Sequence, residues 1–449
     1  MKEIFQTLNL NTHFELLGAE TLPSKFNVTD LAAWSLGAVG CSIAALIERM
    51  NLSATVPKVV VDRRLASLWF NTSLYPIGWE LPPLWDAVAG DYQAKDGWIK
   101  IHTNLPHHRA AALSVLDVTA DREAVAKAIA SWDKDTLETA IVNAGGVSAA
   151  MRTRSQWITH QQGRAVALDP LIKWSEPSSI ELRDWSPTLE QPLSGLRVLD
   201  LTRVLAGPVA TRTLAGFGAD VLRIDPLEWD EANIVPDITL GKRCARLDLK
   251  AKNDRDIFEK LLSEADVLVH GYRSGALDQL GYSEAQRQKI SPALIEVCLN
   301  AYGWAGPWKQ RRGFDSLVQM SSGIAEEGQR WANTEKPTPL PVQALDHATG
   351  YLMAASVIRA IDDVLAGKGR RNAKLSLART AELLFANQSE QPNSSSIEAA
   401  RSDFSQKIEA AAWGQAHRLK PAITVAGTPM KWDRAACELG SSKPRWIEY

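Results

Sequence analysis

Cysteine is scarce in this chain: there are four among 449 residues, Cys41, Cys244, Cys298 and Cys437. They lie far apart, with no CxxC pair and no spacing typical of metal ligands. The pattern therefore predicts no disulfide framework and no metal site. Thiols used in this way favour a reducing, cytoplasmic location.

No sign of charge is in excess either, because 50 Lys and Arg face 52 Asp and Glu, giving a net charge of −2. A balanced chain with a pI near 6.5 has no broad basic field for a phosphate backbone, so we expect no nucleic-acid partner. An anionic ligand would have to be bound by basic side chains close to its own site. With 45% hydrophobic residues the chain can bury ordinary globular cores.

Long hydrophobic runs are also missing. The N-terminus lacks a charged segment followed by an apolar one, so it does not resemble a signal peptide. The longest uncharged stretch, Leu31 to Ile47, contains Ser and Gly, which favours a buried helix over a membrane span. We expect no membrane association.

A strand–helix–strand unit begins almost two hundred residues into the chain. Leu196 to Leu201 is an aliphatic strand, Val209 to Phe217 has helical spacing, and Ala219 to Ile224 is a second buried strand. The turn between the first two reads RVLAGPVA, without GxGxxG, although Asp225 closes the second strand. Nicotinamide or flavin binding is therefore disfavoured, and no permanently bound cofactor is expected.

The alternation continues downstream. Residues 243–250, 266–272 and 292–303 read as strands, and residues 253–265 as an amphipathic helix. This part of the chain is predicted to be α/β with a largely parallel sheet.

Seven blocks in order carry a resemblance to a known family. They include LSGLRVLDLTRVLAGP, GFGADVLRID, EADVLVHGYRSGALDQLGYS and ALDHATGYLMAASVIRAI. Over residues 193–385 the chain resembles the family III CoA-transferases, a family that also includes the α-methylacyl-CoA racemases. The resemblance implies a Rossmann-like, largely parallel sheet with a smaller α+β domain, and coenzyme A or acyl-CoA as a substrate rather than a resident cofactor.

The segment before residue 193 looks like a second, partial copy. Residues 30–70 and 346–385 each read as Asp, a small-residue helix, a strand and a helix ending in Phe, at a constant offset of 315 from Lys58 to Phe70. Chance similarity of two Ala-rich helices is the alternative. We divide the chain into a partial copy with a small domain (1–188), the CoA-binding and catalytic region (189–386), a flexible polar loop (387–405) and a C-terminal return segment (406–449).

The resemblance places the family's nucleophile on Asp346, whose carboxylate would exchange acyl and CoA groups through an anhydride and an aspartyl-CoA thioester. An unperturbed aspartate is ionised at pH 7 and needs no adjacent base. From its position alone, Asp346 would more often be a helix N-cap. Its counterpart Asp30 is interpreted as an N-cap only.

The family's CoA contacts map onto two turns, a basic pair and a tyrosine. Lys242 and Arg243 would meet phosphates, although a solvated turn is the simpler reading of this pair. The chain departs from the family at Gly271-Tyr272 and at Gln279. The predicted contacts are Arg203, Val204, Ala206, Lys242, Arg243, Tyr272, Arg273, Ala276 and Tyr302.

We therefore expect an enzyme that moves CoA from an acyl-CoA to a carboxylic acid. Two alternatives stay open: a racemase, or a non-catalytic subunit that binds CoA esters. Racemisation needs an acid and a base beside the α-carbon, and Phe314 stands where racemases have histidine. A homodimer is expected, because half-copies would expose apolar faces.

Overall fold

A computed structural model describes residues 1–388 and 396–448. Its central sheet has seven strands in the order β10-β9-β8-β11-β12-β13-β7, all parallel except the edge strand β7. The predicted α/β class with a largely parallel sheet is confirmed. The strands are β7 (Lys173–Trp174), β8 (Arg197–Leu201), β9 (Asp220–Asp225), β10 (Arg243–Arg246), β11 (Val267–His270), β12 (Ile295–Asn300) and β13 (Ala373–Ser376).

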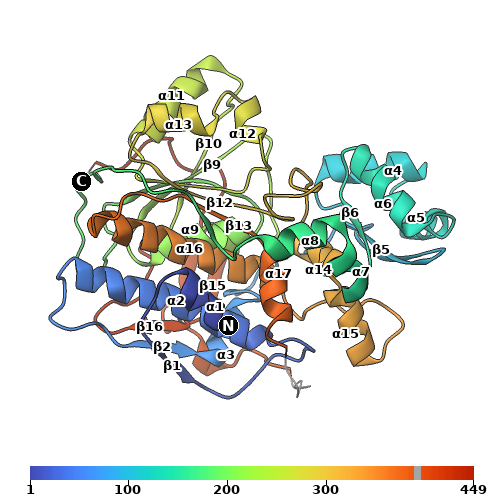
Figure 1. The fold of residues 1–449 in the computed structure, drawn as a ribbon, viewed down its shortest axis with the longest axis horizontal. Coiled ribbons are helices and arrows are strands. Elements are labelled where there is room, and N and C mark those ends of the chain that lie inside the picture. The colour runs from blue at the N-terminus through green and yellow to red at the C-terminus, as the bar shows by residue number, and fades with distance from the viewer. Residues whose placement is uncertain (389–395, 449) are drawn as a thin grey trace.

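Helices cover both faces of this sheet (Figure 1). Those that follow its strands are α9 (Ala206–Gly216), α10 (Val235–Ile238), α11 (Lys252–Ser263), α12 (Ala276–Gln279), α13 (Glu284–Ile290), α14 (Asp315–Ser322), α15 (Ile324–Ala332), α16 (Ala344–Leu365) and α17 (Leu377–Phe385). In chain order the parallel strands are arranged as 3-2-1-4-5-6, so the order reverses between β8 and β11. Ligands of such sheets bind at the carboxyl ends of the strands at this point.

A smaller α+β unit protrudes from one end of the molecule (Figure 1). Its three strands form an antiparallel sheet, and its helices bury a separate core around Ile99, Val125 and Leu137. The elements are β4 (Gly90–Ala94), β5 (Gly97–Ile101), α4 (Pro106–Leu116), α5 (Arg122–Ile129), α6 (Lys134–Asn143) and β6 (Ser148–Ala150). Helices α7 (Arg154–Thr159) and α8 (Gln161–Leu168) lead back to β7.

The N-terminal segment repeats the helix–strand–helix order of α16, β13 and α17. Its elements are α1 (Lys2–Thr7), β1 (Phe14–Leu17), α2 (Val28–Arg49), β2 (Val59–Asp62) and α3 (Arg63–Trp69). Both α2 and α16 have 22 residues, and they lie side by side. Of the described helices, α2 alone is long and apolar enough to cross a membrane. However, 83% of its apolar 18-residue stretch is buried within the protein. It is the buried helix that the sequence predicts.

The strand arrangements of the two segments also match. Strand β2 lies between parallel β1 and antiparallel β16 (Ile423–Val425), as β13 lies between parallel β12 and antiparallel β7. Val59 is opposite Phe14 and Val425, and Ala373 is opposite Val297 and Trp174. The first half of the chain thus supplies β7, the edge strand of the central sheet. The C-terminal segment supplies β16, the edge strand of the sheet formed with β1 and β2. We call this arrangement the reciprocal strand exchange.

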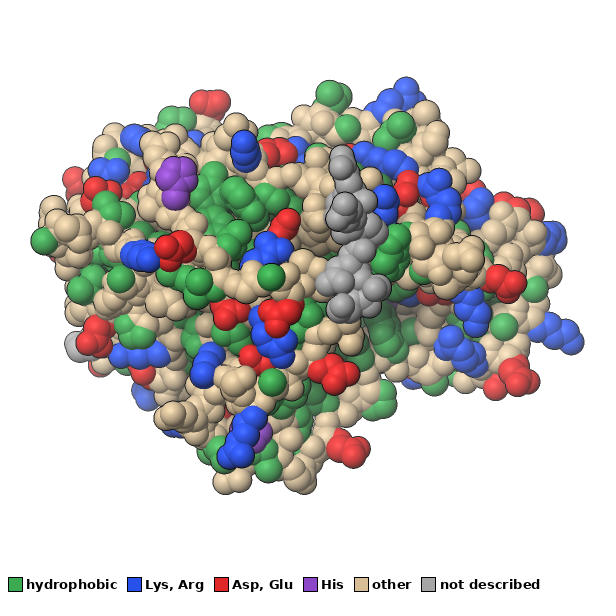
Figure 2. All heavy atoms as spheres, turned by 90° about the horizontal axis from the view of Figure 1, so that it is seen from below, with side chains coloured by type: hydrophobic (Ala, Val, Ile, Leu, Met, Phe, Trp, Pro, Cys, Tyr) green, Lys and Arg blue, Asp and Glu red, His purple; other side chains and the backbone are tan. Residues whose placement is uncertain are grey.

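The polar segment 387–405 lies partly outside the described residues. Its described end, expected to be flexible, is packed: Arg64 binds the Asp403 carboxylate, with Nη2 and Oδ2 3.0 Å apart, and the Glu398 carbonyl. Beyond the short 3₁₀ helix Arg401–Asp403, strands β14 (Glu409–Ala411) and β15 (Gly414–Arg418) form a sheet with β3 (Leu74–Pro76). Acidic and basic side chains are interspersed on the face shown in Figure 2, as the charge balance predicts.

Candidate active site

Two predicted CoA contacts meet where the strand order reverses. Arg203 follows β8 and Tyr272 follows β11, and the Arg203 Nη2 donates a hydrogen bond of 2.8 Å to the Tyr272 hydroxyl. The Arg203 guanidinium lies 4.9 Å from the ring centre of Tyr272 and 4.8 Å from that of Trp229. Stacking on two aromatic rings holds this arginine in place.

The backbone is strained beside Arg203. Val204 has φ of 66°, a left-handed conformation that a β-branched residue rarely adopts and that costs about 1–3 kcal/mol. Its N–H donates a 2.5 Å hydrogen bond to Glu231, which also accepts one from Arg223. A buried network therefore fixes the strained turn, and strain of this kind is typical of ligand-binding turns.

Helix α16, which carries the predicted nucleophile, packs directly on this turn. Ala206 begins α9, and a Cβ atom built on Gly350 of α16 would lie 2.3 Å from the Ala206 carbonyl oxygen. Gly350 thus allows a close approach that a larger side chain would prevent. The predicted CoA turn and the predicted nucleophile are in this way fixed relative to each other. Ala276, another predicted contact, begins α12 on the β11 side.

The basic pair has structural partners. The Lys242 ammonium is fully buried and lies 3.0 Å from both the Asp200 carboxylate and the Pro208 carbonyl oxygen. Burial lowers the pKa of Lys242, and Asp200 opposes this. Arg243 binds Asp220 at 2.9 Å. The solvated-turn reading is wrong for Lys242, and a phosphate contact by this pair stays a prediction that the geometry does not favour.

Tyr302 is also buried, and its hydroxyl lies 3.2 Å from the Ser321 hydroxyl. Exposed basic side chains are found instead at Arg273, Lys309 and Arg312, none of which has a carboxylate partner in the described part of the chain. Ser274 donates to the Lys309 carbonyl at 3.2 Å, which joins their loops. Burial, and then Arg273, lower the pKa of Arg312. Of these three side chains only Arg273 is among the predicted CoA contacts, although the KQRR run at 309–312 is a visible sequence signal for a basic cluster.

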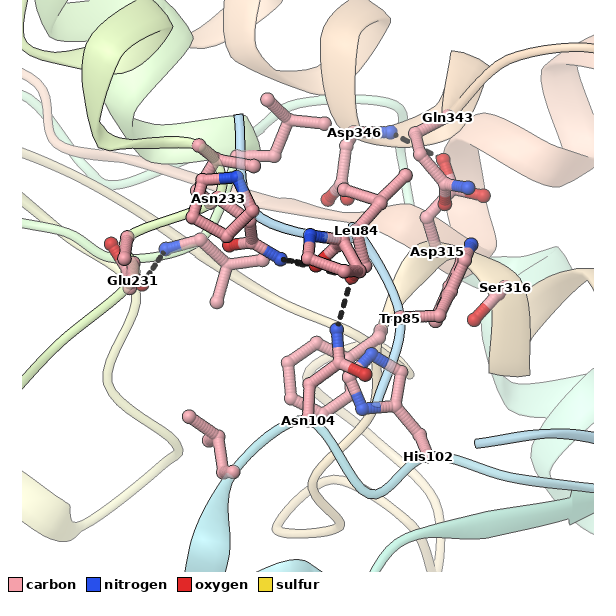
Figure 3. A pocket seen from close by; sticks show the side chains of 18 of the residues that line it. Leu84, Trp85, His102, Asn104, Glu231, Asn233, Asp315, Ser316, Gln343 and Asp346 are labelled. Atoms are coloured by element: carbon pink, nitrogen blue, oxygen red, sulfur yellow. Dashed lines mark hydrogen bonds between the residues drawn. The ribbon is translucent and has the colours of Figure 1, made fainter. Parts of the chain in front are cut away.

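Asp346 is the third residue of α16 and is 7% exposed. The N-cap position belongs to Gln343, and no side chain caps this helix, so the capping alternative for Asp346 is wrong. Its side chain lines a pocket of about 350 Å³ (Figure 3). A buried carboxyl that neither caps its helix nor faces a cation is available for chemistry.

A second carboxyl lies against Asp346. Asp315, at the start of α14, is fully buried and accepts the Asp346 N–H at 2.9 Å. Burial raises the pKa of Asp315 to about 6. Burial, and then the charge of Asp315, raise the pKa of Asp346 well above its ordinary value. The expectation of an aspartate with an unperturbed pKa is therefore wrong, because neighbouring buried carboxyls do not both ionise freely.

Asp30 occupies the equivalent position in α2 but has a different partner. The N-cap of α2 is Asn27, without a side-chain cap, so the predicted capping role of Asp30 is wrong. Its carboxylate instead pairs with the guanidinium of Arg63. Asp30 lines a separate cavity beside Met1 and Asn387.

Three parts of the chain build the pocket around Asp346. The first half contributes the segments 82–85 and 102–106, the sheet contributes 204–205 and 230–234, and the start of α14 contributes 314–316. Phe314 stacks on His102 with ring centres 4.0 Å apart. A phenylalanine moves no proton, which argues against the racemase alternative at this position.

One group outside the pocket could in principle hold a metal ion. Ligand atoms of His270, Glu296 and Cys298 lie within 4.8 Å of one another. Arg287 pairs with Glu296 at 2.7 Å, however, so the carboxylate already has a cation. The cluster forms part of a buried ion-pair network and gives no reason to add a metal.

Known proteins resemble part of the chain. Over 213 residues it is 30% identical to an acetyl-coenzyme A transferase, nodX, of Hypoxylon pulicicidum, a match covering 45% of this chain and 36% of that protein. It is 30% identical to a formyl-CoA:oxalate CoA-transferase of Escherichia coli, covering 41% of this chain and 47% of that protein. The matches thus span about half or less of these relatives.

Solved structures also match part of the chain. A CAIB/BAIF family protein from Brucella suis is 25% identical, with 50% of this chain and 65% of that chain covered and a TM-score of 0.40. A hypothetical protein from Mycobacterium tuberculosis is 28% identical, with 47% and 58% covered and a TM-score of 0.40. The sequence profile of CoA-transferase family III matches residues 193–444, more than half of the chain. The chain therefore belongs to CoA-transferase family III.

Proposed function

We propose that the protein transfers coenzyme A from an acyl-CoA to a carboxylic acid, with Asp346 as the nucleophile. The observation that carries the proposal is the position of the Asp346 carboxyl, which lines the pocket without a cation or a capping bond. The strained turn at Val204 lines the same pocket. The acyl group would occupy this pocket, and CoA would extend past Arg203 and Tyr272 to the cluster Arg273, Lys309 and Arg312.

The reaction needs no net proton transfer. A carboxylate oxygen of Asp346 attacks the thioester carbonyl carbon, the C–S bond breaks, and CoA leaves as the thiolate. The thiolate then attacks the aspartyl carbonyl of the mixed anhydride, which releases the donor acid and leaves an aspartyl-CoA thioester. The acceptor carboxylate reverses these two steps and restores the free carboxylate of Asp346.

Asp346 must lose its proton before it can attack. Since burial and the charge of Asp315 raise its pKa, this step needs a higher pH than it would for an ordinary aspartate. We propose that Asp315 fixes the helix start through the Asp346 N–H and sets the pH range of the reaction. Exchange would therefore rise with pH across the range in which the pair loses its protons.

Mass spectrometry of the protein after incubation with acyl-CoA esters tests the proposal. Hydroxylamine or borohydride should trap a mass change on the peptide that contains Asp346. Asp346→Asn should lose exchange by several orders of magnitude and still bind CoA, because an amide is a very poor nucleophile. Solvent deuterium appearing at the α-carbon without exchange would favour the racemase, and CoA binding without an adduct would favour a non-catalytic subunit.

We also propose that residues 1–188 and 189–449 stand for parts of two protomers, combined in one chain. The equal helix lengths, the matching strand arrangements and the reciprocal strand exchange support this interpretation. A fragment 189–449 should not fold alone, because it lacks α2 and β7. The expected homodimer stays a prediction, which light scattering of the purified chain tests.

A further inference from the structure

Glu231, which lines the pocket that holds Asp346 (Figure 3), binds two different groups with its two carboxylate oxygens. Oε1 accepts the Val204 N–H at 2.5 Å, and Oε2 accepts Nη2 of Arg223 at 2.8 Å. The side chain of Glu231 is 4% exposed and that of Arg223 is fully buried. A buried, charge-assisted pair has a well-defined geometry, so the oxygen that receives the Val204 N–H is held in place as well.

The same arginine also supports the residue before Val204. Arg223 donates to both oxygens of Asp225, at 2.8 and 3.0 Å, and Oδ1 of Asp225 lies 3.7 Å from Nε of Arg203. Two guanidinium groups and two carboxylates thus form one network with balanced charge. Because Arg203 and Val204 are adjacent in the chain, the network holds the turn at two successive residues.

A valine needs such support in this conformation. Its φ of 66° is left-handed, which β-branched residues rarely adopt, so Val204 favours a negative φ when nothing opposes it. Only residues 202–205 connect β8 to α9, and a change in the sign of φ would redirect the chain between them. The hydrogen bond from the Val204 N–H to Glu231 opposes that change.

The turn is also in contact with the helix that carries Asp346. A Cβ atom built on Gly350 would lie 2.3 Å from the Ala206 carbonyl oxygen, and Gly350 follows Asp346 by about one helical turn. Val204, Leu205 and Asp346 line the same pocket. A displaced turn would therefore change the distance between the pocket wall and the Asp346 carboxyl.

Attack on a thioester depends steeply on such distances. The reacting atoms must come within about 3–3.5 Å of each other, and a displacement of about 1 Å can cost on the order of a hundredfold in rate. Arg203, by contrast, also stacks on the rings of Tyr272 and Trp229, which hold it independently of Glu231. Loss of the contact between Glu231 and Val204 should then slow the covalent steps more than it weakens CoA binding.

We infer that Glu231 is a positioning residue for CoA transfer, which holds Val204 in its left-handed conformation and thereby places the pocket wall against Asp346. The inference rests on the proposed CoA transfer at Asp346. Glu231 acts through the backbone of Val204 and takes no part in the covalent steps. Arg223 acts one step further away, by fixing the carboxylate of Glu231.

A double-variant cycle tests this role, because glycine adopts a positive φ without a steric penalty. Glu231→Gln keeps the size of the side chain, but its amide has only one acceptor oxygen for Arg223 and the Val204 N–H. In Glu231→Gln, kcat of CoA transfer should fall at least about tenfold, whereas Kd of CoA, from calorimetry, should stay within about threefold of the wild type. In the Val204→Gly background the same substitution should lower kcat by at most about threefold.

Glu138→Gln is the matched control. Glu138 is likewise buried, accepts a backbone N–H, that of Ala150 at 3.0 Å, and pairs with Arg152 at 2.6 Å. It lies on α6 of the smaller α+β unit, and Ala150 is a strand residue. Glu138→Gln should keep kcat within about threefold in both backgrounds. Thermal melting verifies folding.

A second variant keeps the test decisive if Glu231→Gln does not fold. Glu231→Asp keeps the negative charge beside Arg223 but is one methylene shorter, so it cannot reach both partners at their present positions. It should show the same loss of kcat, and the same recovery in the Val204→Gly background.

The outcomes separate the inference from the proposed function. An equal loss of kcat in the two backgrounds, weaker CoA binding without a loss of kcat, or an unchanged kcat would overturn the inference and leave CoA transfer intact. Absence of transfer and of any adduct on Asp346 in the wild type would overturn the proposed function, and the inference with it.

Discussion

The backbone N–H of Asp346 donates a 2.9 Å hydrogen bond to Oδ2 of Asp315, so that one carboxyl holds the helix start on which the other lies. Asp315 thus takes up a donor that the start of α16 would otherwise offer. Because the two groups titrate together, protons leave the pair in coupled steps. The carboxyl pair is thus a structural support and an electrostatic control at once.

Replacing Asp315 should change the pH dependence of exchange. The charge of Asp315 raises the pKa of Asp346, so Asp315→Asn should lower that pKa and shift the acidic limb of the kcat/KM profile to lower pH. Rates of CoA exchange between pH 4.5 and 9 provide the measurement. Asp30→Asn is the control, and its profile should match the wild type. A limb that stays in place in Asp315→Asn would contradict the coupling.

Asp346 should also cost the protein stability at high pH. Its folded pKa is raised, so the folded state binds more protons than the unfolded state, and stability falls as pH rises above the unfolded pKa of about 3.9. Asp346→Asn removes this loss. Urea unfolding should show the variant to be more stable at pH 8, on the order of 1 kcal/mol or more, with the gain vanishing near pH 4. An equal gain at both pH values would show that ionisation is not its cause.

Lys242 provides a test of a buried ion pair against a phosphate contact. Lys242→Met leaves the Asp200 carboxylate buried without its cation and should destabilise the protein by about 3–5 kcal/mol in urea unfolding. The double variant Asp200→Asn/Lys242→Met should recover part of this loss. Weaker CoA binding at unchanged stability would instead support the phosphate role. Arg273 is exposed, so Arg273→Met should weaken CoA binding and keep the free energy of unfolding within about 0.5 kcal/mol of the wild-type value.

Asp30 should prove dispensable for exchange. Its carboxylate pairs with Arg63 and lines a different cavity from Asp346, so Asp30→Asn should keep CoA exchange within a few-fold of the wild type. Exchange assays beside Asp346→Asn provide the comparison. A loss as large as that of Asp346→Asn would mean that Asp30 is a second nucleophile.

Local sequence patterns predict much of the central sheet. The strand expected at Leu196–Leu201 is β8 at Arg197–Leu201, and the strand expected at Ala219–Ile224 is β9 at Asp220–Asp225. The helix between them begins three residues earlier than expected, at Ala206, because the Gly-Pro pair fits the first turn of a helix. These elements were predictable because their hydrophobic spacing is set by the next few residues.

Contacts between distant residues were not predictable in the same way. Lys242 reads as a surface turn until the fold places Asp200 beside it, 42 positions away. His102 carries no signal in its own segment, and only the packing of the small domain against α14 brings its ring onto Phe314. The raised pKa of Asp346 likewise depends on a partner 31 positions away. Long-range packing, rather than local propensity, makes the site.

The reciprocal strand exchange has an evolutionary consequence. A homodimer encoded by one gene changes both of its active centres with every mutation, since the two copies are identical. Here the positions of Asp346 and Asp30 are encoded separately, and each can change while the other is held constant. One centre can keep a carboxyl pair for catalysis, while the other takes an arginine partner and a supporting role. Selection can therefore make the two positions different within a single polypeptide, which it cannot do in a symmetric homodimer.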